Sequence, residues 1–127
     1  MNKICTSIEQ SKKLIELGID INTADMLWTY DFMAGHINGI NVISELLKPE
    51  ENDIPAWSFM ALNNIIKDNC ERCEIHLRND KKYNIFITSG TFIYRSFDTY
   101  PNGFDELVDA CYEAVYWLKK KNIYNYE

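Results

Sequence analysis

The stretch DELVDACYEAVYWLKKK, residues 105–121, carries the clearest secondary-structure signal of the chain. Its apolar residues recur at positions i, i+4, i+7, i+8 and i+11, which places them along one side of an α-helix. They are Leu107, Cys111, Ala114, Val115 and Leu118. Asp105 and Glu106 precede this stripe, where the helix dipole favours negative charge, and three lysines follow it at residues 119–121. The pattern predicts an amphipathic helix of about 15 to 18 residues.

Two further helices are predicted upstream of this stretch. The first covers residues 7–17, because Thr6 and Glu9 have the spacing of a capping box and Gly18 can adopt the left-handed conformation that ends many helices. The second covers residues 55–69 and has a proline as its first residue. Its apolar face is formed by residues at helical spacing, namely Phe59, Leu62, Ile65 and Ile66.

Five short strands are predicted from other patterns. In residues 26–33 the apolar period changes to two, and partial burial is expected on both sides of the strand. The residues that point to one side are Met26, Trp28, Tyr30 and Phe32. Gly35, Asn38 and Gly39 are turn formers, and residues 40–43 are expected to return as an antiparallel partner. A three-stranded meander is predicted from residues 73–78, 83–88 and 91–97.

The order of these elements is α-β-β-α-β-β-β-α, with a charged, exposed connection at residues 48–53. Helices and antiparallel strands in such runs indicate the α+β class. We therefore expect one small antiparallel sheet of about five short strands packed with three helices. A chain of 127 residues, 46% hydrophobic and 25% charged, is long enough for one core, so residues 1–127 are predicted to form a single domain.

Charge and hydropathy exclude several classes of partner. The net charge is −6 and residues 119–121 are the one compact basic block, so direct binding to nucleic-acid phosphates is disfavoured. No apolar run reaches the roughly 18 residues that span a bilayer, and no signal peptide precedes the first helix. We expect a cytoplasmic protein that does not bind membranes. The cysteines are then expected to be reduced, and they are Cys5, Cys70, Cys73 and Cys111.

Cys70, Cys73 and His76 form the sharpest metal-binding candidate, because thiolates and imidazole at close spacing suit zinc. They are half of a site, since structural zinc takes four ligands. If residues 73–78 form a strand, Cys73 and His76 point to opposite faces. A redox role for the Cys-x-x-Cys pair is a further alternative, although such pairs usually sit at a helix N-terminus. We expect structural cysteines and no cofactor.

Catalytic templates are missing from the sequence. His36 and His76 are the two imidazoles, and neither lies in a motif for acid–base or nucleophilic catalysis. Three carboxylates follow one side of the last helix at i, i+4 and i+8, and they are Asp105, Asp109 and Glu113. This row could bind a cation, but it is more typical of a solvated helix face. No catalytic residue is assigned.

Aromatic residues gather in and after the last helix. Tyr112 and Tyr116 flank the apolar stripe, and Trp117 and Tyr124 continue toward the C-terminus. Tyrosine and tryptophan are enriched at protein interfaces because they combine a large apolar area with a polar group. These four residues are predicted to form an interaction surface for a second copy of the chain or for another protein, with core packing as the alternative for Trp117.

Three stretches of the sequence resemble a family of small uncharacterised proteins from gut Bacteroidetes and their phages or mobile elements. They are CTSIEQSKKLIELGIDINTADM at 5–26, DIPAWSFMALNNII at 53–66 and DELVDACYEAVYWLKKKNI at 105–123. The most distinctive pieces are Ile-Pro-Ala-Trp-Ser at 54–58 and Thr-Ala-Asp-Met at 23–26. The resemblance implies a small accessory or interaction protein of bacterial or mobile-element origin, and it carries over no functional residue.

Three functions remain open at this point. The first is a noncatalytic accessory or protein-interaction module. The second is a small enzyme with a cleft beside the sheet that lacks a motif, lined by residues such as Trp28, Tyr30, Asp31, His36 or Trp57. The third is an acidic, phage-type inhibitor that presents carboxylates to a basic site.

Overall fold

The computed structural model describes residues 3–44, 47–69, 72–89, 92–97 and 104–125. It confirms the α+β class and the predicted order of helices and strands. In chain order the elements are α1 (Ile8–Glu16), the short 3₁₀ helix η1 (Ile21–Thr23), β1 (Met26–Asp31), β2 (His36–Val42), β3 (Ile54–Ala56), α2 (Phe59–Asn69), β4 (Arg72–Leu77), β5 (Tyr83–Ser89), β6 (Phe92–Phe97) and α3 (Leu107–Asn125).

The described strands form two antiparallel sheets of three strands each, where the sequence predicted one sheet. Their orders are β2-β1-β3 and β4-β5-β6. The additional strand is β3, whose residues Ile54–Ala56 pair with β1. Pro55 therefore lies in an edge strand, where a missing N–H is tolerated, and α2 begins at Phe59 rather than at the proline.

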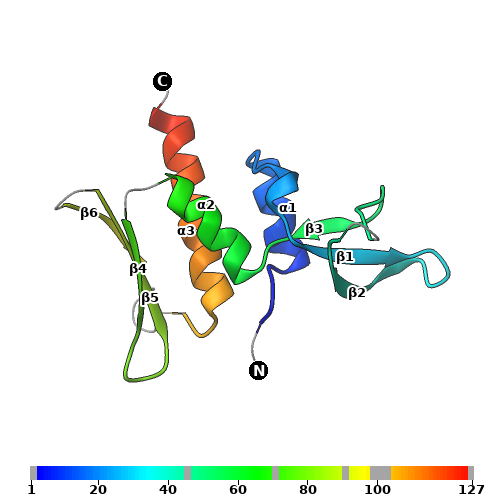
Figure 1. Cartoon of the computed structure of the whole chain (residues 1–127), viewed down its shortest axis with the longest axis horizontal. Helices are drawn as coiled ribbons and strands as arrows, with labels where there is room; N and C mark the ends of the chain where they lie inside the picture. The colour runs from blue at the N-terminus through cyan, green and yellow to red at the C-terminus, as the bar shows by residue number, and fades with distance from the viewer. Residues whose placement is uncertain (1–2, 45–46, 70–71, 90–91, 98–103, 126–127) are drawn as a thin grey trace.

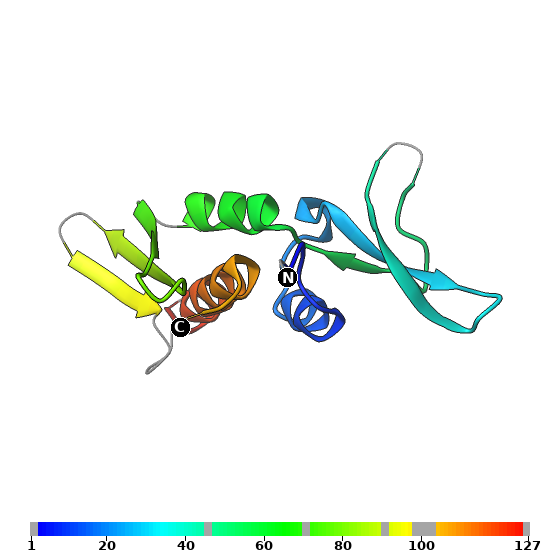
Figure 2. The ribbon, with the colours of Figure 1, turned by 90° about the horizontal axis from the view of Figure 1, so that it is seen from below.

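The helices lie between the two sheets (Figure 1). α2 and α3 pack against each other, and both contact the β4-β5-β6 sheet. α1 contacts β3, which belongs to the other sheet. The β1–β2 hairpin extends away from the helices in both views (Figure 2). One end of the molecule is therefore a sheet backed by helices, and the other is a projecting hairpin.

The core forms where α2 and α3 meet, and the stripe predicted from residues 107–118 contributes to it. Cys111, Ala114 and Val115 are fully buried, as are Leu62 and Ile66 from α2. Burying a side chain of Val, Leu or Ile contributes about 1.5–3 kcal/mol to the free energy of unfolding. This apolar seam is the main stabilising contact between the two longer helices. No helix of the described residues has the length and apolar character needed to cross a membrane.

The cap of α1 differs from the prediction by one residue. Ser7, not Thr6, is the N-cap, and its capping-box partner is Gln10 rather than Glu9. Ser7 Oγ accepts a hydrogen bond from the Gln10 N–H at 3.1 Å, and Gln10 Oε1 accepts from the Ser7 N–H at 3.0 Å. Thr6 is buried instead and bonds to the backbone of Trp57. Gly18 ends the helix with a φ of +88°, as predicted.

Candidate functional site

The β1–β2 hairpin carries its apolar side chains on one face. Residues directly opposite each other in an antiparallel pair share a face of the sheet. The register pairs Met26 with Val42, Trp28 with Ile40, and Tyr30 with Ile37. These six side chains form what we call the hairpin face. All six are partly or fully exposed in the described structure, and Val42 is 63% exposed.

A β-bulge brings the β2 side chains onto this face. Ile37 and Ile40 are three residues apart, so an unbroken strand would place them on opposite faces. The register shifts between Trp28 and Tyr30, so Thr29 faces the two-residue segment 38–39, and the extra residue returns Ile37 to the side of Ile40. The second residue of this segment, Gly39, has a φ of +157°, which glycine adopts most readily.

The side of the hairpin opposite the hairpin face is the one buried against the body of the protein. Leu27 lies on the opposite face and is fully buried, and its partner Pro55 in β3 is buried as well. Farther along, Asn41 donates a hydrogen bond to Thr29 Oγ1 at 3.1 Å on that side. The side chains of β1 therefore alternate between two faces, as predicted. Leu27 anchors one face to the body of the protein, and the face that includes Met26 and Trp28 stays partly accessible.

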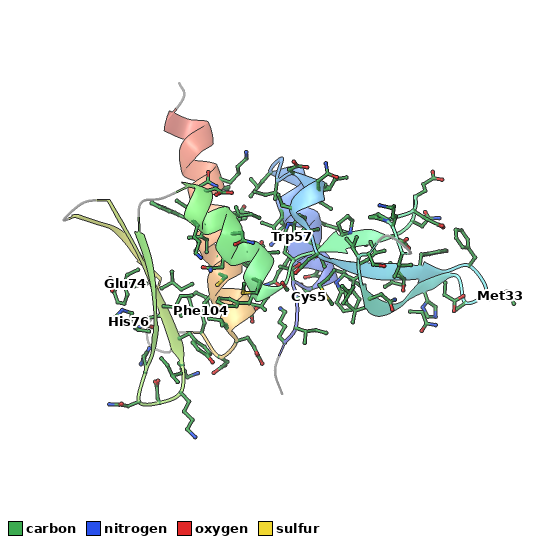
Figure 3. All side chains as sticks on the ribbon, viewed as in Figure 1. Cys5, Met33, Trp57, Glu74, His76 and Phe104 are labelled. Carbon is green, nitrogen blue, oxygen red and sulfur yellow. The ribbon has the colours of Figure 1, made fainter. Side chains whose placement is uncertain are left out.

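The tip of the hairpin is exposed and apolar. Phe32 is 70% exposed and Met33 is 98% exposed, and Met33 stands at the far end of the molecule (Figure 3). The strand ends at Asp31, so Phe32 lies in the turn. Its ring packs edge-to-face against the ring of Tyr30, with 5.1 Å between the ring centroids. The turn itself closes at Gly35, with a φ of +75°, before β2 begins. The predicted turn formers at 38–39 lie inside β2 instead.

Asp31 holds the turn and stays charged. Its Oδ1 accepts hydrogen bonds from the backbone N–H groups of Met33 and Ala34, and its Oδ2 accepts from Asn38 Nδ2 at 2.9 Å. These donors, led by the Ala34 N–H, lower the pKa of the Asp31 carboxyl, because each one favours the ionised form. A negative charge therefore stands beside the exposed Phe32 and Met33.

The base of the hairpin is joined to the helices by the two motifs singled out at 23–26 and 54–58. Trp57 Nε1 donates to Thr23 Oγ1 at 2.9 Å. Asp25 accepts two hydrogen bonds from Ser58, one from its N–H at 2.9 Å and one from its hydroxyl. The Ser58 hydroxyl oxygen in turn accepts from the Ala61 N–H at 3.3 Å, as an N-cap of α2 does. The two motifs form one structural junction.

The N-terminal segment is the third part of this junction. Thr6 exchanges backbone and side-chain hydrogen bonds with Trp57, its N–H donating to Trp57 O at 2.9 Å and its Oγ1 accepting from Trp57 N at 3.0 Å. The Thr6 carbonyl accepts from Trp28 Nε1 at 3.0 Å. A hollow of about 300 Å³ lies beside Trp28. It is lined by Lys3, Ile4, Cys5, Ser7 and Trp28 and extends the hairpin face toward the body.

The predicted aromatic surface on α3 is only partly accessible. Tyr112 is 5% exposed and belongs to the core, which corrects its assignment to a surface. Burial raises the pKa of its hydroxyl to about 12. Tyr116 and Trp117 are half-buried against the same core, and Lys120 Nζ lies 4.9 Å from the centre of the Tyr116 ring. Tyr124 lies in α3, and its side chain is outside the described residues.

The zinc candidates are described only in part. Cys70 lies outside the described residues, and so does the side chain of Cys73, which occupies β4. His76 is on the outer face of the β4-β5-β6 sheet, with Nε2 3.9 Å from Glu74 Oε1 and its ring edge-to-face with Phe86 at 5.0 Å. Among the side chains that the structure describes, no group of three or more His, Cys, Asp or Glu could hold a metal ion.

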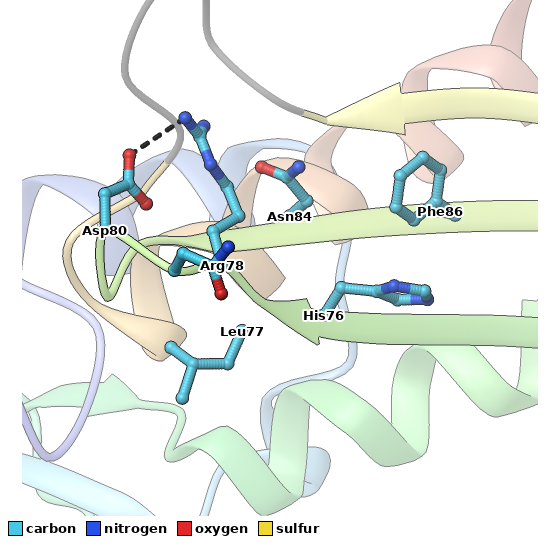
Figure 4. A pocket seen from close by; sticks show the side chains of 7 residues that line it. His76, Leu77, Arg78, Asp80, Asn84 and Phe86 are labelled. Atoms are coloured by element: carbon cyan, nitrogen blue, oxygen red, sulfur yellow. Dashed lines mark ion pairs between the residues drawn. The ribbon is translucent and has the colours of Figure 1, made fainter.

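A shallow hollow of about 570 Å³ lies beside His76 (Figure 4). Its lining also includes Phe86 and Asn84 from β5 and the β4–β5 turn, where Arg78 and Asp80 form an ion pair at 2.9 Å. Asn84 Oδ1 is buried and has no hydrogen-bond partner in the described structure. The guanidinium group of Arg78 is paired with Asp80 in the same turn. The hollow therefore presents mainly aromatic and amide side chains.

The predicted row of carboxylates, Asp105, Asp109 and Glu113, faces lysines. Lys82 Nζ lies 2.6 Å from Asp105, and Lys3 Nζ lies 2.6 Å from Asp109. Asp109 also accepts from Gln10 Nε2 at 2.9 Å. The pKa of the third carboxyl group, Glu113, is raised, mainly because the group is partly withdrawn from solvent and also because Asp109 is nearby, while Lys13 acts in the opposite direction. The row therefore connects α3 to the N-terminal segment, to α1 and to the start of β5.

The residues suggested for a catalytic cleft do not converge. Trp57 is fully buried, and Asp31 and His36 form the last cross-strand pair at the hairpin tip. His36 is exposed, and its Nδ1 lies 2.8 Å from the Ile37 carbonyl oxygen. The residues that sequence reasoning missed are Ile37, Ile40 and Met33. The signal for the first two was present as apolar residues in residues 37–42, but only the bulge places them with Trp28.

Comparison of the chain with protein-family models, with curated proteins and with solved structures finds no match.

The two buried cysteines among the described residues are expected to resist alkylation. Cys5 and Cys111 are both buried, and burial raises the pKa of the Cys5 thiol from 9.0 to about 11, with a further contribution from Asp25. Because the thiolate is the reactive form, iodoacetamide at pH 8 should modify Cys5 about a hundredfold more slowly than an exposed thiol. Peptide mapping by mass spectrometry measures this rate.

The same peptides labelled in 8 M urea provide the control for this prediction, since unfolding exposes both thiols. The native state holds the Cys5 proton more tightly than the unfolded chain, so stability should fall as pH rises from 9 toward 11. Labelling of Cys5 at equal rates with and without urea would contradict its burial.

Proposed function

We propose that the protein is a noncatalytic protein-interaction module, with the hairpin face and the tip residues Phe32 and Met33 as its binding surface. The observation that carries this proposal is the register of the hairpin, which lines up three apolar cross-strand pairs on a partly exposed face. Folded monomers rarely leave large contiguous apolar patches exposed, and those that they do leave often mark interaction sites.

The chemistry of this surface supports the same proposal. Aromatic residues and methionine are enriched at protein interfaces, and the hairpin face and tip together hold three aromatic and two methionine side chains. The hairpin projects from the body (Figure 2), so a partner can reach its tip and the hairpin face. Its base is held by the Trp57 and Asp25 hydrogen bonds, which present the surface on a rigid support.

The wider biological setting is also a proposal. The resemblance of residues 5–26, 53–66 and 105–123 supports an accessory protein of bacterial, phage or mobile-element origin, and we propose that it acts in the cytoplasm. The acid-rich composition, with a net charge of −6, supports the variant in which the module acts as an inhibitor of a basic target. Tyr116, Trp117 and Tyr124 remain candidates for a second contact surface on α3, including a contact with a second copy of the chain.

Photo-crosslinking tests the proposed binding surface. We expect p-benzoylphenylalanine in place of Met33 to give a discrete crosslinked product in cells of the organism that encodes the protein. The mass of the product distinguishes another protein from a second copy. The matched control carries the same residue at Met60, which is 60% exposed in the first turn of α2 and is not part of the hairpin.

Two outcomes bear on the proposal. A product at position 33 that is absent at position 60, and that disappears when Phe32 is changed to serine, supports it. Equal products at both positions, or none at position 33 while position 60 reacts, would show that the hairpin tip is not the contact surface.

A further inference from the structure

The net charge of the protein resides in the segment that carries the hairpin. Residues 18–56, here called the hairpin lobe, hold seven acidic residues and one basic residue, a net charge of −6. The acidic residues are Asp20, Asp25, Asp31, Glu45, Glu50, Glu51 and Asp53, and the basic one is Lys48. The rest of the chain holds twelve acidic and twelve basic residues. The lobe is therefore acidic and the body is balanced.

Several of these carboxylates are fixed in the structure of the lobe. Asp31 accepts three hydrogen bonds at the hairpin tip. Asp53 accepts from the Tyr30 N–H at 2.8 Å and from the Glu50 N–H at 2.9 Å. Glu50 and Glu51 are exposed in the loop before β3. Asp31 therefore places negative charge beside β2, whereas Asp53, Glu50 and Glu51 lie on the β3 side of β1. The hairpin face itself contains no ionisable group other than the Tyr30 hydroxyl.

The outer edge of β2 is the least protected sheet edge among the described strands. Proteins guard edge strands with charged residues, proline or very short length. β3 has three residues and includes Pro55, while β4 includes Arg72 and Glu74 and β6 includes Arg95. β2 is seven residues long and contains no Lys, Arg, Asp, Glu or Pro. Its position in the order β2-β1-β3 leaves one side without a described strand.

From these features we infer that the partner is a basic protein segment that adds to β2 as an extended strand, with apolar side chains against the hairpin face and cationic side chains toward the acidic lobe. This inference rests on the proposed function and names its partner. Strand addition supplies backbone hydrogen bonds, and alternate side chains supply specificity. A second copy fits less well, because it would bring two lobes of net charge −6 together.

Three synthetic strands test the inference with the full chain. The basic probe is the peptide Lys-Val-Lys-Phe-Lys-Val-Lys, and the matched neutral and acidic probes replace every lysine with serine or glutamate. We expect the basic peptide to bind at least about tenfold more tightly than the neutral one at low salt, and the difference to shrink at high salt. Amide chemical shifts in the ¹⁵N-labelled protein should change at residues 36–42.

Two sets of variants distinguish the contribution of the β2 edge from that of the negative charge of the lobe. Val42→Lys places a positive charge on the edge strand and should weaken the basic peptide at least about tenfold, whereas Met60→Lys, at a residue of similar exposure on α2, should not. Glu50 and Glu51 lie on the β3 side of β1 and act on a peptide at β2 only through the electrostatic field of the lobe. The double variant E50Q/E51Q should therefore weaken the basic peptide about two- to threefold at low salt and leave the neutral peptide unchanged. Thermal melting confirms that each variant is folded.

Each alternative result overturns the inference. Equal affinity for the neutral or acidic peptide rules out a basic partner, and shifts confined to residues outside 26–42 rule out addition to β2. Binding of none of the three peptides also rules it out. The proposed function is judged separately by crosslinking at position 33, so a crosslinked partner together with failed peptide binding leaves the interaction module standing without this partner class.

Discussion

Replacing Trp57 by alanine is expected to lower the free energy of unfolding by about 3–5 kcal/mol. Trp57 is the largest fully buried side chain and packs in the main core. The substitution leaves a cavity between the helices and the hairpin, and it removes the Nε1–H bond to Thr23. For a domain with a total stability of about 5–15 kcal/mol, this is a large fraction of the total.

Urea unfolding followed by circular dichroism measures this effect, because the signal does not depend on the removed tryptophan. We expect an unchanged dependence on urea concentration and a lower midpoint. W57F is the matched control: it retains most of the packed volume and loses the indole donor, so it should cost about 1–2 kcal/mol. A loss below about 1 kcal/mol for W57A would contradict the role of Trp57 as the central packing residue.

Asp25 and Ser58 are expected to act as one unit. D25A leaves the Ser58 N–H without its carboxylate acceptor and should cost about 2 kcal/mol. S58A removes the hydroxyl that caps α2 at Ala61 and should cost about 1–2 kcal/mol. Because both changes break the same network, the double variant should cost less than the sum of the single ones, with a coupling energy of at least about 1 kcal/mol.

The control for this cycle pairs S58A with D20A. Asp20 accepts a hydrogen bond from the Asn22 N–H in the exposed turn of η1, outside the Asp25–Ser58 network. These two changes should add within about 0.5 kcal/mol. Additivity of D25A with S58A as well would mean that the Thr-Ala-Asp-Met and Ile-Pro-Ala-Trp-Ser motifs are not coupled through this contact.

Local patterns were sufficient wherever one element buries a regular stripe. The stripe at residues 107–118 predicts α3 and its buried side, since helical periodicity and burial coincide there. The meander is predicted for the same reason at period two, and β4, β5 and β6 pair in that order. Gly18 marks the end of α1 because its left-handed conformation is a local property.

Local patterns failed wherever a distant segment competes for the same group. Thr6 and Ser7 both precede α1 and both could cap it, but Thr6 is taken by Trp57, fifty-one residues away, and Ser7 is left as the cap. Pro55 could begin a helix, but β1 recruits residues 54–56 as a third strand. Tyr112 was expected on a surface, but α3 is covered on that side and buries it.

Only the β1 half of the candidate site could be predicted from the sequence. Sequence periodicity places Met26, Trp28 and Tyr30 on one side of a strand. It does not indicate which side is buried, because that depends on where Leu27 and Pro55 meet the body. It also does not bring Ile37 to the same face, because a bulge is a property of two paired strands rather than of one.

The amino-acid sequence by itself determined the α+β class, the order of the elements, the apolar stripe of α3 and the acidity of residues 18–56, because each depends on neighbouring residues or on simple counts. The tertiary structure alone decided that the strands divide into two sheets, that the two distinctive motifs meet at Trp57, and that one face of the hairpin stays accessible. Those outcomes require contacts between residues far apart in the chain. The local sequence allows each group several partners, and only the complete set of contacts in the folded chain decides which arrangement has the lowest free energy.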